Sequence, residues 1–199
     1  MIPARLSLKN FMCYRDNVPP LNFENFHMAC LCGDNGHGKS ALLDAMTWAL
    51  WGKSRARTNE ELVHMGQTEM EVEFEFDINT DRYRLKRSYR SRPAQKRPGQ
   101  TSLDLFIARD GQYQTLSSGV EETERKIREL LKLDYDTFTN SAFLRQGKAD
   151  EFTRKTPSER KEILANILNL SIYELLAEKA KEYRNSKQEE HLLVKTLIE

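Results

Sequence analysis

One run of residues constrains this chain more than any other feature. Gly33-Asp-Asn-Gly-His-Gly-Lys-Ser40 matches the phosphate-loop pattern G-x-x-x-x-G-K-[ST] in full. Such a loop wraps a phosphate so closely that several backbone N–H groups point inward, and glycine leaves that approach open. The pattern carries weight only where a strand precedes it and a helix follows it. It therefore predicts an α/β chain that binds a nucleoside triphosphate.

Both flanks of the loop fit this requirement. Residues 28–32 form a short apolar run that ends at glycine and predicts a buried strand. After the loop, apolar residues recur at helical spacing, and Gly52 stands where a helix is expected to end. The residues of that helical pattern are Leu42, Leu43, Ala45, Met46, Ala49 and Leu50. The alternative, a glycine-rich turn that binds no nucleotide, does not account for these flanks.

The residue types inside the loop suggest their roles. Lys39 supplies a positive charge for the β- and γ-phosphates, and the Ser40 hydroxyl is a ligand for Mg²⁺. The helix that begins near Lys39 directs its positive N-terminal end at the same anion. Asp34 and His37 are expected to be ordinary loop residues. The predicted cofactors are thus a nucleoside triphosphate and Mg²⁺.

Alternating patterns outside the loop predict an antiparallel sheet. Leu6 and Leu8 open a first extended segment, and residues 69–108 contain a three-stranded flank in which apolar and charged residues alternate. The first two strands of this flank are expected to join through Asn79-Thr80-Asp81. Residues 90–100 are expected to form a long loop before the third strand.

The second half of the chain is predicted to be helical. An amphipathic helix follows Gly119, and Thr156-Pro-Ser-Glu159 carries the signals of a helix start, with Ile163, Leu164, Ile167 and Leu168 as its buried face. Residues 176–197 follow a heptad-like spacing that predicts the start of a coiled coil; a solitary surface helix is the alternative. The predicted domains are a globular lobe over 1–155 and a helical segment over 156–199.

Composition excludes several classes of protein. Lys plus Arg number 31 against 30 for Asp plus Glu, so net charge indicates no partner. The N-terminus has no apolar stretch of signal-peptide length, and no apolar run is long enough for a bilayer, so no membrane association is expected. Cys13, Cys30 and Cys32 fit neither a disulfide framework nor a zinc site. Cys30 and Cys32 are expected to be buried thiols, which favours a cytoplasmic protein.

A basic stretch interleaved with Tyr83 and Tyr89 has two interpretations. It could track a nucleic-acid backbone, or its charges could pair with Glu69, Glu71, Glu73 and Glu75 of the neighbouring strand. Neither interpretation is preferred from these residues alone. The basic residues are Arg82, Arg84, Lys86, Arg87, Arg90, Arg92, Lys96 and Arg97.

Four segments in order carry a family resemblance: residues 8–11 (Leu-Lys-Asn-Phe), 35–45 (Asn-Gly-His-Gly-Lys-Ser-Ala-Leu-Leu-Asp-Ala), 143–147 (Phe-Leu-Arg-Gln-Gly) and 157–164 (Pro-Ser-Glu-Arg-Lys-Glu-Ile-Leu). Together they resemble the SbcC family, the ATPase component of the SbcC–SbcD (Mre–Rad type) complex of DNA double-strand-break repair. The resemblance covers essentially the whole chain. It implies the N-terminal lobe of an ABC/SMC-type ATPase head, a P-loop NTPase whose cofactors are ATP and Mg²⁺.

The resemblance also implies roles for individual residues. The nucleotide-binding residues it implies are Asn35, Gly36, Gly38, Lys39, Ser40 and Ala41, and Gln146 matches the glutamine that reaches Mg²⁺ and the attacking water. Lys39 and Gln146 are thus the catalytic candidates, and Ser40 and Gln146 the metal ligands. Arg55 and Arg57 lie where a basic residue near the nucleotide is conceivable, but a solvated loop is the commoner role. Met12 and Cys13 depart from the family, which often has basic or hydroxyl residues there.

The chain lacks part of what phosphoryl transfer needs. It contains no apolar run ending in Asp-Glu and no Leu-Ser-Gly-Gly-like signature, and the resemblance implies that a C-terminal segment supplies both. The expected partners are therefore that C-terminal half, a second head in an ATP-dependent homodimer, an SbcD-type nuclease and double-stranded DNA. The resemblance favours DNA for the basic stretch and a nucleoid-associated location. The alternatives are a RecN-, RecF- or SMC-type protein, a small stand-alone NTPase and a structural coiled-coil protein.

Overall fold

The computed structural model describes residues 1–24, 26, 28–92, 99–135, 138–139, 155–167 and 171–198. The chain divides into two compact units, Met1–Tyr135 and Asp136–Glu199. The predicted domain boundary at residue 155 stays a prediction. Among the residues described, no helix is long and apolar enough to cross a membrane.

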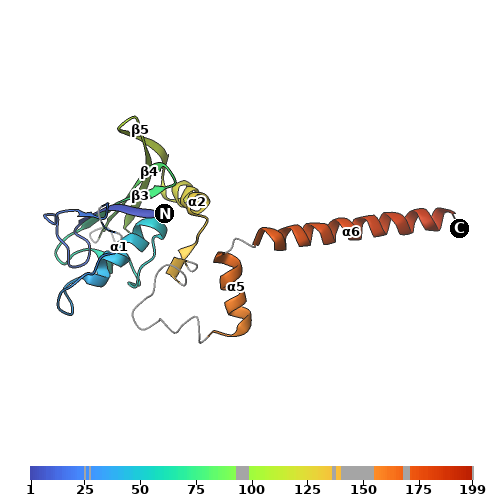
Figure 1. Cartoon of the computed structure of the whole chain (residues 1–199), viewed down its shortest axis with the longest axis horizontal. Helices are drawn as coiled ribbons and strands as arrows, with labels where there is room; N and C mark the ends of the chain where they lie inside the picture. Colours follow the sequence, from blue (N-terminus) through green and yellow to red (C-terminus); the bar gives the residue numbers. More distant parts are fainter. Residues whose placement is uncertain are drawn as a thin grey trace. The chain divides into compact units, whose positions relative to one another are not determined.

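The first unit is built on one antiparallel sheet of six strands in the order β2-β1-β3-β4-β5-β6. Figure 1 labels its strands β3, β4 and β5, which follow one another across the sheet. Neighbours from β3 to β6 follow each other along the chain, and β1 inserts beside β3. The strands are β1 (Ile2–Lys9), β2 (Leu21–Asn22), β3 (Glu69–Ile78), β4 (Asp81–Arg90), β5 (Gln100–Arg109) and β6 (Gln112–Ser118).

The three-stranded flank that the sequence predicts is confirmed as β3, β4 and β5. Ile78 pairs with Asp81, so the first hairpin turns through Asn79-Thr80, with Asn79 at a φ of 55°. Strand β6 was not predicted from the sequence, because polar and apolar residues alternate only weakly along it. The overlooked signal is Asp110-Gly111, a two-residue hairpin turn with φ values of 51° and 77°.

Two helices, α1 (Lys39–Trp51) and α2 (Val120–Leu131), pack against the sheet. Both lie on the face where the apolar side chains of β3 to β5 point, and Trp48 and Ile127 are the fully buried anchors of the two helices. A short 3-10 helix, η1 (Glu60–Leu62), adds Leu62 to this core. The sheet contributes Leu6, Leu8, Met70, Val72, Phe74, Phe76, Leu85, Leu103 and Leu105.

The predicted strand over residues 28–32 is wrong for this chain. Met28 is 92% exposed and Leu31 is 47% exposed, and the residues have no strand assignment. A strand requires a hydrogen-bonded neighbour, and among the described residues none pairs with this segment. The expected burial of Cys30 and Cys32 fails for the same reason, since both thiols are exposed, with sulfur atoms 3.7 Å apart.

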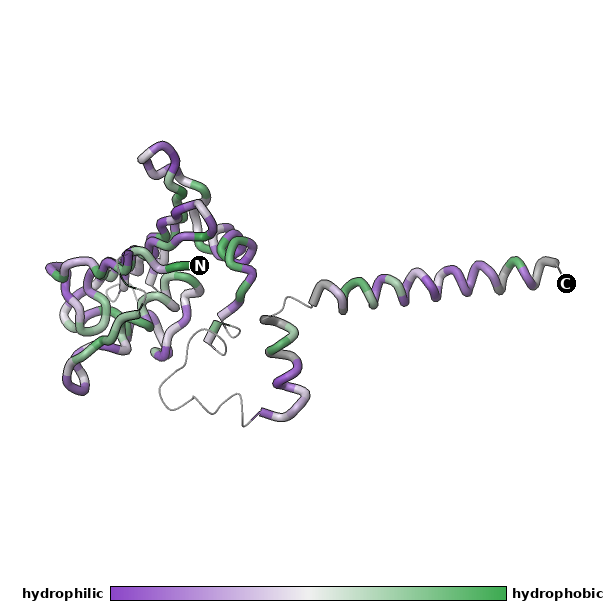
Figure 2. The backbone as a smooth tube through the Cα atoms, in the orientation of Figure 1, coloured by the Kyte–Doolittle hydropathy of each residue, from purple (hydrophilic) through white to green (hydrophobic). Residues whose placement is uncertain are grey.

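The second unit contains α5 (Pro157–Ile167) and α6 (Ser171–Ile198). The predicted start of α5 is confirmed: Thr156 Oγ1 accepts from the Glu159 backbone N–H, and the Glu159 carboxylate accepts from the Thr156 backbone N–H at 2.8 Å. Leu164, predicted to be buried, is 47% exposed. Hydrophilic stretches alternate with hydrophobic ones along α6 (Figure 2), and Leu176, Tyr183 and Val194 are exposed. The coiled-coil pairing of α6 stays a prediction.

Candidate nucleotide site

The glycines of the phosphate loop adopt backbone conformations that other residues avoid. Gly36 and Gly38 have φ values of 86° and 84°, and Gly38 is the residue immediately before α1. A Cβ atom at Gly33 or Gly36 would meet no other atom within 4 Å. The loop therefore offers an open, main-chain-lined face ahead of the helix N-terminus. These features fit a phosphate group.

Lys39 ties the two ends of this loop together. Its ammonium donates to the backbone carbonyl oxygens of Gly33 and Asp34, at 2.5 and 2.8 Å. The charge is thus held over the mouth of the loop, where phosphate oxygens can replace the carbonyls as acceptors. Ser40 follows as the second residue of α1 and is half-buried.

The predicted nucleotide-binding residues form one continuous loop and helix start. Asn35, Gly36 and Gly38 lie in the loop, and Lys39, Ser40 and Ala41 open α1. The Ala41 backbone N–H donates to the Gly38 carbonyl at 2.9 Å, which closes the first turn. Gln146, the predicted partner of Mg²⁺ and water, lies outside the described residues.

A second segment supports the loop from behind, and sequence analysis did not foresee it. The Tyr14 hydroxyl donates to the Gly38 carbonyl at 3.1 Å, and a Cβ atom at Gly38 would lie 2.4 Å from Cys13 Sγ. Burial raises the pKa of the Tyr14 phenol, so the hydroxyl keeps its proton as a donor. The contact joins residues 24 positions apart in sequence, so no local sequence pattern predicts it.

His64 fixes this supporting segment. Its backbone N–H donates to the Asn10 carbonyl at 2.8 Å, and its Nδ1 lies 2.7 Å from the Met12 carbonyl oxygen. Nδ1 must donate to that carbonyl, which leaves Nε2 to accept from Arg15 Nε at 3.3 Å. His64 was another residue that sequence reasoning missed.

Arg55 and Arg57 follow the far end of α1. After Gly52 the chain turns back along this helix, and the Arg55 backbone N–H donates to the Asp44 carboxylate at 3.2 Å. Arg55 pairs with Asp44 of α1 at 2.6 Å, and the Arg57 backbone N–H donates to Glu61 at 3.0 Å. These contacts match the surface-loop interpretation of the two arginines.

The predicted DNA-contacting residues of β4 lie on the outer face of the sheet, each beside carboxylates of β3. The pairs are Arg82–Asp77 at 2.9 Å, Arg84–Glu75 at 2.8 Å, Lys86–Glu71 at 3.0 Å and Arg90–Glu69 at 3.1 Å. These cross-strand contacts are the ones that the second interpretation of the basic stretch predicted. Arg92 hydrogen-bonds to Gln100, and Lys96 and Arg97 lie outside the described residues.

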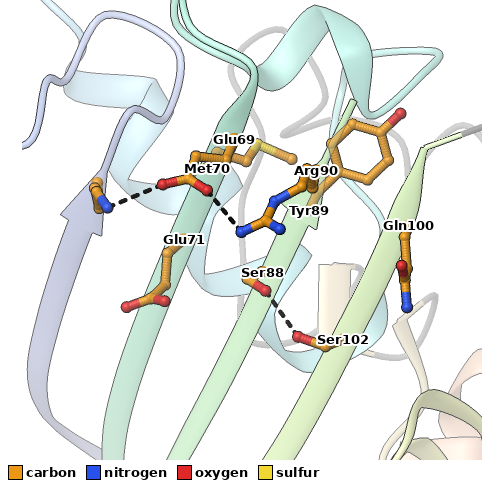
Figure 3. A pocket seen from close by; sticks show the side chains of 9 residues that line it. Glu69, Met70, Glu71, Ser88, Tyr89, Arg90, Gln100 and Ser102 are labelled. Atoms are coloured by element: carbon orange, nitrogen blue, oxygen red, sulfur yellow. Dashed lines mark hydrogen bonds and ion pairs between the residues drawn. The ribbon is translucent and has the colours of Figure 1, made fainter. Parts of the chain in front are cut away.

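A polar hollow of about 390 Å³ occupies one end of this outer face (Figure 3). Ser88 and Ser102 leave room there because their side chains are small, and their hydroxyls hydrogen-bond to each other at 2.7 Å. Lys9 and Arg90 both contact Glu69 across the rim, and these two hydrogen bonds, that of Lys9 first, lower the pKa of its carboxyl. The phosphate loop contributes no residue to this hollow.

Known proteins are similar to this chain over most of its length. A family model described as "AAA domain" matches residues 5–199. This chain belongs to the AAA domain family. Its relatives show that it is of the SbcC/Rad50 type. It is 33% identical over 171 residues to the "DNA double-strand break repair Rad50 ATPase" of Thermoplasma volcanium, covering 85% of this chain and 18% of the relative.

Two bacterial relatives carry the name of the SbcC component of the SbcCD nuclease. That of Deinococcus radiodurans is 29% identical, covering 94% of this chain and 21% of its own length. That of Bacillus subtilis is 32% identical, and the match covers 87% of this chain and 16% of the length of that relative. The chain thus spans about a fifth of the length of the curated relatives it matches. A solved RecF–ATP structure aligns over 88% of this chain and 41% of its own, with a TM-score of 0.45 and 19% identity.

Proposed function

We propose that this chain is the ATP-binding half of a DNA-repair ATPase head. The observation that carries the proposal is the open phosphate loop with Lys39 held over its mouth, at the start of a buried helix. The SbcC/Rad50-type relatives support ATP as the nucleotide and DNA repair as the setting.

The residues of the site divide the work between them. Main-chain N–H groups of the loop and the N-terminal end of α1 bind phosphate oxygens, and Lys39 neutralises charge on the β- and γ-phosphates. Ser40 and Gln146 would hold Mg²⁺, which when bound offsets the charge that develops during phosphoryl transfer. Tyr14 keeps the loop in shape through Gly38.

Hydrolysis requires a carboxylate that holds Mg²⁺ and one that activates water. Among the described residues no three His, Cys, Asp or Glu side chains gather to hold a metal ion. From the likeness to SbcC/Rad50-type relatives, we propose that a C-terminal half of the same head supplies the carboxylates and that this chain alone does not turn over ATP. Residues 28–32, which pair with no strand in the described part of the chain, offer that half an apolar segment beside the loop.

The wider assembly is proposed by family likeness. A second head would dimerise on ATP, an SbcD-type nuclease would act with it, and double-stranded DNA would be the substrate. If the arginines of β4 contact DNA, phosphates must displace Asp77 and the neighbouring carboxylates of β3. Binding at this face should then be weak and strongly dependent on salt.

The test is ATP hydrolysis by this chain alone and mixed with a C-terminal segment of the same gene. Lys39→Ala is expected to lower turnover about a hundredfold or more. Lys53→Ala is the matched control, because Lys53 lies beyond the far end of α1, over the Tyr135 ring. Turnover only in the mixture, and only with Lys39, supports a split head. Lys39-dependent turnover by the chain alone would instead indicate a self-sufficient NTPase.

A further inference from the structure

One arginine of the basic stretch points the opposite way from its neighbours. Arg87 lies on β4 between Lys86 and Ser88, but its side chain enters the core and is only 3% exposed. The alternation of the strand places it on the same face as Leu85 and Tyr89. An inward arginine on this face must find polar partners among the helices that cover the sheet.

Arg87 contacts both helices at once. Its Nε donates to the backbone carbonyl of Ala49 at 3.0 Å, within the last turn of α1. Its NH2 group donates to the Glu124 carboxylate of α2 at 2.9 Å. The guanidinium also lies 5.9 Å from the centre of the Trp48 ring, and a Cβ atom at Gly52 would stand 2.8 Å from its NH1.

These contacts complete the C-terminal end of α1. The Trp48 carbonyl accepts from the Gly52 backbone N–H, and the Ala49 carbonyl accepts from Arg87. Carbonyls in the last turn of a helix have no partner within the helix, and a cation there also suits the helix dipole. Burial lowers the pKa of the Arg87 guanidinium, and the hydrogen bond to Glu124 opposes that shift. The pair thus holds a buried charge in one fixed geometry.

Of the two helices that meet at Arg87, α1 has the phosphate loop at its N-terminal end, whereas α2 packs against β5 and β6. A rigid link between these helices would fix α1, and with it the phosphate loop, in one position on the sheet.

We propose that Arg87 is a positioning residue which, through Glu124, couples the phosphate loop to α2. The proposal rests on the proposed function, since it assigns Arg87 to turnover. ATP affinity comes from contacts of residues 33–41, at the other end of α1. Those binding contacts move together with the loop, whereas hydrolysis requires the loop to be placed accurately against the groups that the proposed C-terminal half supplies. Loss of the pair should therefore slow hydrolysis of bound ATP and have little influence on how tightly ATP binds.

The first measurement separates binding from turnover. Arg87→Lys keeps the charge, but an ammonium lacks the planar fork that reaches Ala49 and Glu124 together. In the chain mixed with its C-terminal segment, turnover is expected to fall about tenfold, since small misplacements of reacting groups cost that much or more. The ATP dissociation constant of the 199-residue chain should stay within about twofold. Glu124→Gln keeps a hydrogen-bond acceptor, so its turnover should lie between that of Arg87→Lys and that of the parent.

Arg109→Met is the matched control. Arg109 forms an equally short pair, at 2.9 Å with Asp81, but this pair joins two strands and is largely exposed. Its loss should leave turnover and ATP affinity as they are. Melting temperatures of all variants identify any loss that follows from unfolding. A folded Arg87→Lys variant with the parent's turnover would overturn the proposal, as would equal losses in affinity and turnover.

The second measurement needs no hydrolysis. ATP added to the 199-residue chain should slow amide exchange in both α1 and α2. In Arg87→Lys the slowing should persist at the start of α1 and disappear from α2. Persistence in α2 would contradict the coupling. Failure of the mixed parent protein to hydrolyse ATP would instead contradict the proposed function, and the exchange result would still decide whether the helices are linked.

Discussion

Gly38 is the residue at which the phosphate loop meets the rest of the fold. Its φ of 84° allows α1 to begin immediately afterwards, and its missing side chain lets Cys13 and Tyr14 approach from behind. The loop pattern explains why glycine stands there, but only the packed structure shows the second reason. A larger residue at this position is therefore expected to disturb the loop in two ways, through backbone strain and through collision with Cys13 and Tyr14.

Gly38→Ala should weaken ATP binding about tenfold or more. A left-handed conformation costs a non-glycine residue about 1–2 kcal/mol, and the new Cβ atom would lie 2.4 Å from Cys13 Sγ. Adding Cys13→Ala removes the collision but not the backbone strain, so the double variant should recover part of the affinity. Titration with a fluorescent ATP analogue measures both. Affinity in Gly38→Ala equal to that of the parent would contradict this account of the loop.

Tyr89 gives the fold a dependence on alkaline pH. Its hydroxyl donates to Glu60 of η1, and burial first, with that hydrogen bond second, raises its pKa to about 12. Between the ordinary tyrosine pKa of about 10 and this value, the unfolded chain loses the proton before the folded one. Stability that is fully present below pH 10 is therefore lost as the pH rises towards 12.

Melting temperatures of the parent and Tyr89→Phe between about pH 8 and 12 test this expectation. At the lower end the variant should be less stable by about 1–2 kcal/mol, because Glu60 loses its donor. The difference should shrink as the pH approaches 12. Other tyrosines titrate alike in both proteins, so they cancel in the comparison. A difference that stays constant across the range would show that Tyr89 does not carry the effect.

At the scale of elements, helix ends are where local sequence has most control. Gly38 and Gly52 bound α1, and both adopt left-handed conformations. The start of α5 relies on side chains instead, through the reciprocal bonds of Thr156 and Glu159. Because these contacts are local, the start of α5 should respond to substitution without involving the sheet.

Thr156→Ala should speed amide exchange in the first turn of α5 about fivefold, the equivalent of about 1 kcal/mol for a lost cap. The Thr156 backbone N–H, followed by its hydroxyl, lowers the pKa of the Glu159 carboxyl by hydrogen bonding. The contribution of Glu159 is therefore present above the ordinary glutamate pKa and disappears as the pH falls through the lowered one. Glu159→Gln should lose this acid dependence. Unchanged exchange in Thr156→Ala would contradict the capping role.

For the whole molecule, the decisive feature is an exposed apolar segment. Phe26, Met28 and Leu31 are 61%, 92% and 47% exposed, next to the phosphate loop. Apolar side chains gathered in this way on a surface favour association. The proposed C-terminal half would cover them, and in its absence another copy of the chain can do so.

The 199-residue chain alone should therefore self-associate, as measured by sedimentation or light scattering over a range of concentrations. Met28→Ser with Leu31→Ser should reduce the association. Met65→Ser is the control, since Met65 is also 92% exposed but lies on a different turn. Addition of the C-terminal segment should suppress association of the parent. A monomer at every concentration would show that this segment is not a docking surface.

Sequence by itself determined the features that depend on near neighbours. The phosphate loop, both ends of α1, the alternation of β3 to β5 and the cap of α5 each arise from residues a few positions apart. Periodicity and turn chemistry act over that range, so these features could be predicted. Even β6 had a local signal in Asp110-Gly111.

Tertiary structure alone decided what depends on residues brought together from afar. It placed Tyr14 and Cys13 behind Gly38 and paired the outward-facing arginines of β4 with β3. It also showed that Arg87, a member of the basic stretch, links α1 and α2. Within the described ranges it also left residues 28–32 without a neighbouring strand. An apolar pattern records that a segment favours burial, but a strand forms only where another segment supplies its hydrogen bonds.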